Sequence, residues 1–370
     1  MLAGGSSMRV THLFKRTHPM VSLFDPIQIG EIHLPNRIIM APLTRLRGTS
    51  KHIPTQLMVE YYTQRANAGL IISEGIPVIP QGVGYANVTG IWLPQQIEAW
   101  KLVTQSVHHA GGRIFAQLWH VGRISDPRFL DSKLPVAPSA IRPAGHVSLV
   151  RPAIDYVTPR ALETSEIPGI VEAFRKGAEN AKLAGFDGVE IHGANGYLID
   201  QFLQDGSNHR TDAYGGPIEN RARLMLEVAD AVVSVWGAKR VGMHLAPRGD
   251  SQDMHDSNPP VTFGYVAREL GRRGLGFLFS REYFGPDRLG PQLKRQFGGV
   301  YIANERYTLA QANQVIEAGE ADAVAFGQLF IANPDLLARF SSNASLNVPD
   351  PSTFFTPGPH GYTDYPALSV

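Results

Sequence analysis

The feature that most restricts the fold of this chain is a short apolar run, rich in Val, Ile and Phe, that returns along the chain with an amphipathic stretch after it. The runs are Arg37–Pro42, Gly69–Gly75, Arg113–His120, Gly188–Gly193, Arg240–Pro247, Gly276–Glu282, Gly299–Glu305 and Ala323–Gln328. Continuous apolar runs of this length are typical of strands buried on both faces, as in parallel sheets. About eight strand–helix units predict an α/β fold, the (β/α)8 TIM barrel, although a doubly wound sheet satisfies the same count.

The stretches between the runs are predicted to be helices, and Thr308 gives the clearest start signal because it precedes a periodic apolar segment that ends at Gly319. The predicted helices are Thr55–Ala68, Gln95–Ala110, Ile167–Ala184, Ile218–Trp236, Val261–Arg273, Gly290–Gln296, Thr308–Ala318 and Pro334–Arg339.

Two segments depart from this alternation. Leu23–Pro35 alternates with a period of two around a glycine, which predicts a β-hairpin that plugs the bottom of the barrel. Ser125–Arg160 is rich in proline and lacks a helical period, so it is predicted to be a long insert after strand 3 that covers the catalytic face.

The length of 370 residues and a hydrophobic content of 43% suit one large domain, predicted to span residues 23–370. Residues 1–22 carry basic side chains and no acid, and we expect this extension to be disordered. Its composition resembles a transit peptide, but an upstream start codon explains it as well, because Met20 stands just before the first patterned segment. A cytoplasmic location is the expectation.

Composition excludes several classes of protein and site. A net charge of +1 gives no excess of positive charge for nucleic-acid binding, and no apolar run reaches the roughly 18 residues of a membrane helix. Neither nucleic acid nor a membrane is therefore expected as a partner. The chain has no cysteine, so disulfides, thiolate nucleophiles and Cys-bound metal clusters are excluded.

In a TIM barrel the chemistry lies at the carboxyl ends of the strands. Amides, imidazoles, a phenol and a hydroxyl stand at these positions, without a carboxylate pair or a nucleophile–base couple. The residues are Pro42, Leu43, Thr44, Gly75, Gln117, Trp119, His120, His192, Asn195, Tyr197, His244, Arg281, Asn304, Gly327 and Gln328.

Three of these residues, His120, His192 and His244, could in principle share a metal. Asn195 and Gln117 are poor ligands and no HExxH motif is present, so no metal is predicted. A hydrogen-bonded histidine in the core explains each one equally well when it is considered alone.

The densest cluster is formed by His192, Asn195 and Tyr197. A His and an Asn side by side can both donate to one carbonyl or nitro oxygen and stabilise the charge that builds there, while a phenol can protonate a developing carbanion. These groups suit the reduction of an activated C=C bond, but the hydride must come from a nicotinamide or a flavin. No GxGxxG follows a strand, whereas the loops after strands 7 and 8, with Asn304, Gly327 and Gln328, can bind a phosphate.

The chain from Leu23 to Pro366 resembles the old yellow enzyme family of FMN-dependent ene-reductases, in particular its N-ethylmaleimide reductase-like members. Six motifs carry the resemblance in order: Met40–Arg47, Gln117–Ser125, His192–Tyr197, Ser207–Leu224, Ile331–Leu336 and Gly361–Pro366. The resemblance implies a flavoprotein oxidoreductase with tightly bound, non-covalent FMN that uses NADPH or NADH. It also implies small-molecule enone, maleimide, nitroalkene or nitro ester substrates, and a monomer or homodimer.

The same resemblance implies a role for each matching position. His192 and Asn195 match the pair that anchors the electron-withdrawing oxygen, and Tyr197 matches the proton donor. The flavin-binding positions are Pro42, Leu43, Thr44, Gly75, Gln117, His244, Asn304, Gly327 and Gln328, and the substrate pocket is shaped by Tyr85, Trp119 and Tyr283.

Three departures from the family pattern carry predictions. His244 stands where the family has an Arg beside the flavin, which predicts a lower and more pH-sensitive flavin potential if the imidazole titrates near 6.5. Gln328 replaces a basic residue of the phosphate site, and Asn304-Glu305-Arg306 replaces a Gly-rich stretch. We therefore expect FMN to dissociate more readily than from relatives, and Glu305 to point away from the phosphate or to pair with Arg306.

Overall fold

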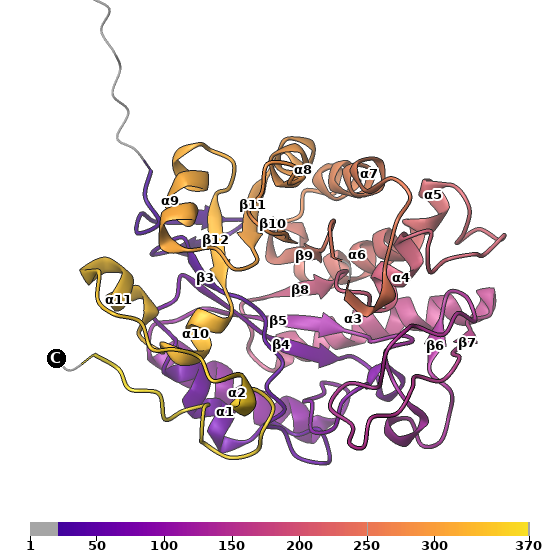
Figure 1. Cartoon of the computed structure of the whole chain (residues 1–370), viewed down its shortest axis with the longest axis horizontal. Helices are drawn as coiled ribbons and strands as arrows, with labels where there is room; N and C mark the ends of the chain where they lie inside the picture. The colour runs from indigo at the N-terminus through magenta and orange to yellow at the C-terminus, as the bar shows by residue number, and fades with distance from the viewer. Residues whose placement is uncertain (1–20, 250, 369–370) are drawn as a thin grey trace, which may run out of the picture.

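Eight parallel strands close into a barrel in the order β10-β11-β12-β3-β4-β5-β8-β9 (Figure 1). The computed structural model describes residues 21–249 and 251–368. Because the sheet is closed, the predicted TIM barrel is confirmed and a doubly wound open sheet is excluded. The strands are β3 (Ile38–Met40), β4 (Leu70–Pro77), β5 (Ile114–Trp119), β8 (Gly188–His192), β9 (Val241–Leu245), β10 (Phe277–Arg281), β11 (Val300–Asn304) and β12 (Ala323–Phe326).

Helices surround the barrel and follow the strands along the chain (Figure 1). Thr308 begins one of them as predicted, because its hydroxyl accepts a hydrogen bond from the Gln311 amide. The predicted helix Ile218–Trp236 is divided at Ala222, and two short helices, α4 and α10, were not predicted. The helices are α1 (Gln56–Thr63), α2 (Pro94–His109), α3 (Ile167–Leu183), α4 (Leu198–Leu203), α5 (Ile218–Arg221), α6 (Arg223–Trp236), α7 (Pro259–Arg272), α8 (Gly290–Phe297), α9 (Leu309–Glu317), α10 (Gln328–Ala332) and α11 (Leu336–Ser342).

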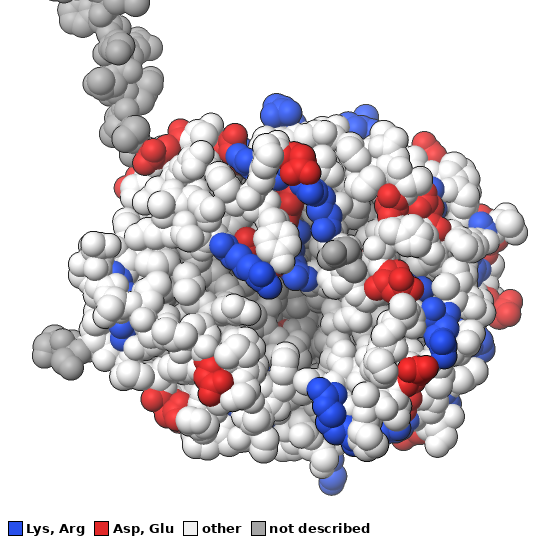
Figure 2. Space-filling model, in the orientation of Figure 1, with Lys and Arg blue, Asp and Glu red and all other residues white. Residues whose placement is uncertain are grey.

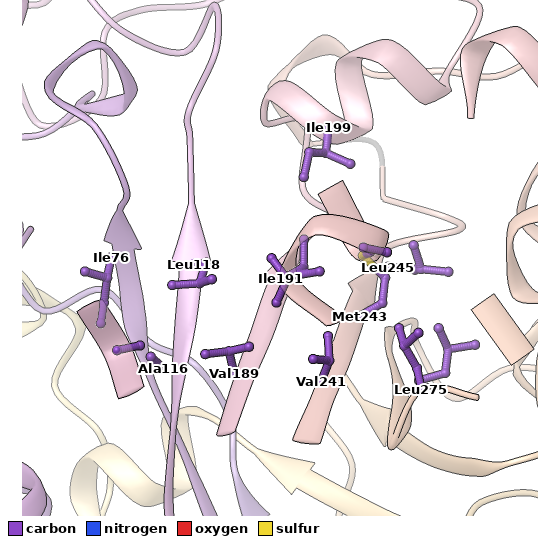
Figure 3. Close-up of a cluster of buried hydrophobic side chains, with 14 of the residues drawn as sticks. Ile76, Ala116, Leu118, Val189, Ile191, Ile199, Val241, Met243, Leu245 and Leu275 are labelled. Carbon is purple, nitrogen blue, oxygen red and sulfur yellow. The ribbon is translucent and has the colours of Figure 1, made fainter. Parts of the chain in front are cut away.

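Alternate strand residues fill two separate apolar layers, as the two-residue period of a strand requires. In β3, Ile39 belongs to the cluster inside the barrel, whereas Ile38 and Met40 pack in the layer between the strands and the helices. Figure 3 shows this outer layer, where Ile191 and Met243 lie among side chains from neighbouring strands. Both faces of the strands are buried, which explains why the strands appear in the sequence as continuous apolar runs.

A β-hairpin closes the amino-terminal end of the barrel. Strands β1 (Ile27–Ile29) and β2 (Ile32–Leu34) pair in antiparallel fashion, and their apolar side chains join the cluster inside the barrel. Gly30 at the turn has φ of +57°, and a Cβ there would lie 1.8 Å from the Lys239 carbonyl oxygen, just before β9 begins. The predicted bottom plug is therefore confirmed.

The long insert after β5 lies over the carboxyl end of that strand. Leu130, Val147 and Tyr156 of the insert pack in one apolar cluster with Tyr85 and Trp119. The two-residue strand β6 (Val136–Ala137) within the insert pairs with β7 (Arg160–Ala161) at its end. The predicted insert after the third barrel strand is confirmed, and it lies at the carboxyl ends of the strands.

Three buried arginines hold the segment that follows α11. The guanidinium of Arg45 donates to the carbonyl oxygens of Phe354 and Gly361, and that of Arg47 donates to those of Thr353 and Phe354. Arg65 donates to the Tyr362 carbonyl of this segment, and also to those of Phe330 and Ile331 in α10. The carboxyl-terminal segment is thus fixed beside the loop that follows β3.

The prediction of a disordered extension at residues 1–22 falls, apart from residues 21 and 22, outside the described part of the chain. Across 21–249 and 251–368, none of the helices has the length and apolar character to cross a membrane.

The outer apolar layer gives a direct test of the packing. We expect Ile191→Ala to lower the free energy of unfolding by roughly 2–5 kcal/mol, because Ile191 is fully buried and the truncation leaves a cavity. Leu183→Ala on α3, where the side chain is 63% exposed, should change it by less than about 0.5 kcal/mol. Urea denaturation of both variants measures the difference, and equal effects would contradict the described packing.

Candidate functional site

A cavity of about 790 Å³ opens at the carboxyl ends of the strands. This volume lies within the range of about 300–1,000 Å³ that is usual for cofactor and ligand pockets. Figure 2 shows that the molecular face in view is hollowed near its centre, with Lys and Arg side chains beside the hollow. Of the residues predicted from the sequence, the cavity is lined by Pro42, Leu43, Asn195, His244, Asn304, Gly327 and Gln328.

The predicted catalytic imidazole His192 stands in a stack of rings beside this cavity. Its ring lies parallel to that of Trp119, with the centroids 5.9 Å apart, and to that of His244 at 5.1 Å. Tyr197 meets both Trp119 and His192 with the edge of its ring. Tyr85 stacks on the far side of Trp119. Two of the predicted pocket aromatics, Tyr85 and Trp119, are therefore in contact with the predicted catalytic residues His192 and Tyr197.

Gly75 is required beneath this stack. A Cβ at position 75 would lie 2.7 Å from the Trp119 ring, so only glycine lets the indole lie flat against β4. This contact explains Gly75 without any ligand, and its predicted flavin contact remains a prediction.

Gln117 determines which ring nitrogen of His244 carries the proton. Its Nε2 donates to a Glu190 carboxyl oxygen at 2.7 Å and lies 3.2 Å from His244 Nδ1. Because an amide nitrogen has two hydrogens, one can serve each partner, and Nδ1 then accepts. The neutral imidazole consequently carries its hydrogen on Nε2, a buried atom without a partner among the described residues. His244 thus presents a donor that a ligand in the cavity can use.

Burial keeps these groups uncharged. It raises the pKa of Glu190 to about 8 and lowers that of His192 to about 3, the latter helped by the charge of Arg281. The pKa of His244 falls well below its usual value, first through burial and then through His192 and Arg281. The expected titration of His244 near 6.5 is therefore wrong, because burial deprives the charged imidazole of the water that would stabilise it. His244 therefore gives the flavin reduction potential no pH dependence near neutral pH.

Among the residues that the structure describes, the His192 ring has one hydrogen-bond partner, which leaves its other ring nitrogen as a donor. Its Nδ1 accepts from the Ala194 amide at 3.4 Å, so the neutral ring carries its hydrogen on Nε2. Asn195 stands three residues farther on, half-buried at the cavity wall. Its Oδ1 accepts from Arg281 at 2.9 Å, which leaves its Nδ2 as a donor.

Tyr197 keeps its phenolic proton. Burial, and next the neighbouring Tyr85, raise its pKa well above the usual value. The Tyr197 hydroxyl lies 2.9 Å from the Tyr85 hydroxyl, which gives it a partner inside the ring cluster. A phenol held neutral in this way can donate a proton to a group that becomes strongly basic during a reaction.

Glu305 pairs with Arg306, as expected, at 3.4 Å, but its closer partner is Arg281 on the neighbouring strand. Asn304 also has a partner, because its side chain donates to the Ala325 carbonyl of β12. Both side chains are therefore directed by protein contacts. Gln328 is exposed at the cavity.

Other predicted residues stand apart from the cavity lining. Thr44 is half-buried next to Leu43, and Tyr283 is 52% exposed with the Arg306 guanidinium over its ring. His120 accepts a hydrogen bond from Gly122 and does not join the stack of His192 and His244. Within the described residues no group of three or more His, Asp or Glu side chains is arranged for a metal ion.

Sequence reasoning missed the partners that orient the site. Arg281 was recognised only as a charged residue at a strand end, and Glu190 received no role. The signal for Glu190 was its place between Val189 and Ile191, because a carboxylate in an apolar run must be paired or neutral when buried. No signal in the sequence joins Arg281 to Asn195, 86 positions away.

The residues present fit a flavin mononucleotide. The unpartnered His244 Nε2 at the cavity wall asks for an acceptor, which a flavin ring offers. Pro42, Leu43 and Phe326 supply apolar walls, and the exposed Gln328 can donate to a phosphate. These residues could hold an FMN in the cavity.

Comparison with known proteins agrees with this geometry. Residues 22–347 match the model of the NADH:flavin oxidoreductase / NADH oxidase family. The 12-oxophytodienoate reductase 1 of Oryza sativa subsp. japonica is 42% identical over 361 residues, which cover 94% of this chain and 93% of the relative. An old yellow enzyme homologue from Zymomonas mobilis is 44% identical with a TM-score of 0.91, over 94% of this chain and 100% of that one. A morphinone reductase in complex with tetrahydroNAD is 49% identical with the same TM-score, over 94% and 98%.

The buried Glu190 predicts a specific pH dependence of stability. Its folded pKa of about 8 lies above the unfolded value of 4.5, so the stabilisation is complete below pH 4.5 and is lost as the pH rises to 8. Glu190→Gln keeps an acceptor for Gln117 and removes this titration. We expect the free energy of unfolding of the variant, relative to that of the wild type, to increase by on the order of a few kcal/mol from pH 5 to pH 8. Urea denaturation at both pH values measures this, and a constant difference would contradict the buried, protonated carboxyl.

Proposed function

Because the chain belongs to the NADH:flavin oxidoreductase / NADH oxidase family, we propose that this oxidoreductase reduces activated C=C bonds with FMN as its redox group. The predicted similarity to old yellow enzymes is confirmed. The proposed substrates are α,β-unsaturated carbonyls, maleimides and nitroalkenes, with nitro esters as a further class. The observation that carries the proposal is a pair of donors without a partner among the described residues, His192 Nε2–H and Asn195 Nδ2–H. Asn195 lines the cavity, while the His192 ring stacks on the cavity residue His244 and contacts the half-buried phenol of Tyr197.

FMN, held by Pro42, Leu43, His244, Asn304, Gly327 and Gln328, would supply the hydride that amino-acid side chains lack. NADPH or NADH is the proposed reductant, and the tetrahydroNAD bound to the similar morphinone reductase supports a nicotinamide.

His192 and Asn195 bind the electron-withdrawing oxygen of the substrate. Each donates one hydrogen bond to that oxygen, and the bonds strengthen as negative charge develops on it. Both donors are neutral, since burial holds the pKa of His192 near 3 and an amide does not titrate. They stabilise the charge without a proton transfer, so the oxygen stays bound while the α-carbon, next to the electron-withdrawing group, accepts the proton.

Tyr197 provides that proton. Its hydroxyl gives the proton to the carbon that becomes basic, and the Tyr85 hydroxyl at 2.9 Å stabilises the phenolate that remains. Trp119 packs against both Tyr85 and His192 and keeps the two rings in place.

The first experiment is the colour and turnover of the purified protein. We expect the visible absorption of an oxidised flavin and the NAD(P)H-dependent reduction of 2-cyclohexenone, N-ethylmaleimide and a nitroalkene. A colourless protein that binds a small phenol or phosphate ester without turnover would support the rival interpretation, a barrel with a damaged flavin site.

The two donors give a sharp test of the mechanism. In the double variant His192→Ala/Asn195→Ala we expect the oxidation of the reduced enzyme by 2-cyclohexenone to slow by at least about a hundredfold. Its reduction by NADPH should change far less, because that step develops no charge on the enone oxygen. Rapid-mixing measurements separate the two half-reactions, with His109→Ala at the exposed end of α2 as control. If neither half-reaction changes, the assignment of the pair is wrong.

The departures at the phosphate end predict easy loss of FMN. Gln328 brings no charge to the phosphate. We therefore expect Gln328→Arg to bind FMN on the order of threefold to tenfold more tightly than the wild type and to lose less of it on dilution. Gln105→Arg adds the same charge on the exposed face of α2 and serves as the control. The fluorescence of released FMN gives both dissociation constants. Full retention of flavin by the wild type through dialysis in high salt would contradict the prediction.

A further inference from the structure

Arg281 connects two cavity residues that come from different strands. It is the last residue of β10, and its Nη1 donates to Asn195 Oδ1, beyond the end of β8, at 2.9 Å. Its Nε contacts the carboxylate of Glu305, which follows β11. The Arg281 side chain is 34% exposed and that of Glu305 is 11% exposed, so the pair lies at the cavity wall with the carboxylate as its buried end.

This contact fixes the orientation of the Asn195 amide. A guanidinium has only donors, so the amide atom that faces it must be the oxygen. The oxygen and nitrogen of a planar amide point in different directions, and Nδ2 is thus turned away from Arg281. Among the described residues no acceptor is recorded for Nδ2, which leaves its hydrogens for a ligand in the cavity.

The backbone supports a specific role for these side chains. Asn195, Glu305 and Arg306 have φ values of +57°, +109° and +54°, in the region that favours glycine. Such conformations cost on the order of 1–3 kcal/mol each and cluster at functional sites. The chain keeps a carboxylate at position 305 despite this cost, and that carboxylate holds Arg281.

We propose that Arg281, held by Glu305, is a positioning residue that fixes Asn195 as a hydrogen-bond donor to the electron-withdrawing oxygen of the substrate. The proposal rests on the proposed function, because it gives Asn195 the same role. It adds the reason why the amide presents hydrogens rather than its oxygen. Without Arg281 the amide can rotate, and half of its orientations present an acceptor that repels a carbonyl, imide or nitro oxygen.

A double-mutant cycle in the FMN-loaded protein tests this. The probe is 2-cyclohexenone, titrated by calorimetry into the oxidised holoenzyme without a reductant, so that it binds and does not react. We expect Arg281→Met to raise the dissociation constant by roughly tenfold to a hundredfold, which is the range of a hydrogen bond to a charged group. Asn195→Ala should have a similar effect, and the double variant should bind no worse than Asn195→Ala alone.

Each alternative outcome has a separate meaning. Additive effects in the double variant would show that Arg281 acts on the ligand directly and would overturn the proposal while the role of Asn195 stands. The same holds if Asn195→Ala weakens binding and Arg281→Met does not. If Asn195→Ala leaves binding unchanged, the proposed function of this amide fails and the proposal fails with it.

Two further variants guard against structural damage. Arg273→Met breaks a comparable ion pair, with Asp230, on the helical surface and should leave the dissociation constant unchanged. Glu305→Gln keeps an oxygen acceptor for Arg281 and removes only the charge. It should weaken binding less than Arg281→Met does, and this effect too should vanish in the Asn195→Ala background. An effect that persists there would overturn the proposal even if Arg281→Met does not fold.

Discussion

Closure of the barrel between its first and last strands is the constraint on which the site depends. β12 pairs with β3 through three registered residues, which places the loop after Met40 against the loop after Phe326. A Cβ on Gly327 would lie 3.3 Å from the Leu43 side chain. Cavity walls from opposite ends of the sequence therefore meet only because the hydrogen-bonded ring is complete. Any change that opens this seam separates the ring-binding wall from the phosphate-binding loop.

The same closure buries His192 and His244 at the mouth of the barrel, and this burial determines which chemistry the two histidines can do. His192 and His244 are both neutral, because burial removes the water that would stabilise their charged forms. Each therefore acts as a directional N–H donor. The direction is set by a backbone amide for His192 and by the amide of Gln117 for His244. Positive charge at the cavity wall comes from Arg281 and Arg306, which lie beside Glu305, and from Arg339.

The sequence allowed the fold to be predicted in detail because its signal is local. Strands buried on both faces appear as apolar runs. Seven of the eight predicted runs contain one barrel strand each, and β4 begins in the eighth, Gly69–Gly75, and extends past it to Pro77. Helices α4 and α10 escaped prediction because they are only six and five residues long, too short to show a helical period. Because α10 was not expected, the predicted run Ala323–Gln328 extends two residues past Phe326, where β12 ends, and includes the first residue of this helix.

Site residues were predictable as a set of positions but not as a network. Strand ends are readable, so His192, Asn195 and His244 could be chosen from the sequence. The charge of His244 could not be predicted from the sequence, because its pKa depends on burial and on Arg281 from another strand. The closest partner of Glu305 could not be predicted either, because Arg281, from another strand, approaches its carboxylate more closely than the sequence neighbour Arg306 does. Such contacts depend on side-chain directions that only the assembled barrel defines.

The carboxyl-terminal segment shows how the wall of the site is held from outside. Arg45 and Arg47 follow directly on the cavity residues Pro42 and Leu43, and their guanidinium groups donate to carbonyl oxygens of residues 353–361. Glu74 is the acidic side chain beside them, and burial raises its pKa to about 7. Backbone carbonyl oxygens do not titrate, so they accept from the two guanidinium groups whether that carboxyl is charged or neutral. The loop that forms one wall of the cavity is consequently fixed by the last segment of the chain, so the site requires both ends of the domain.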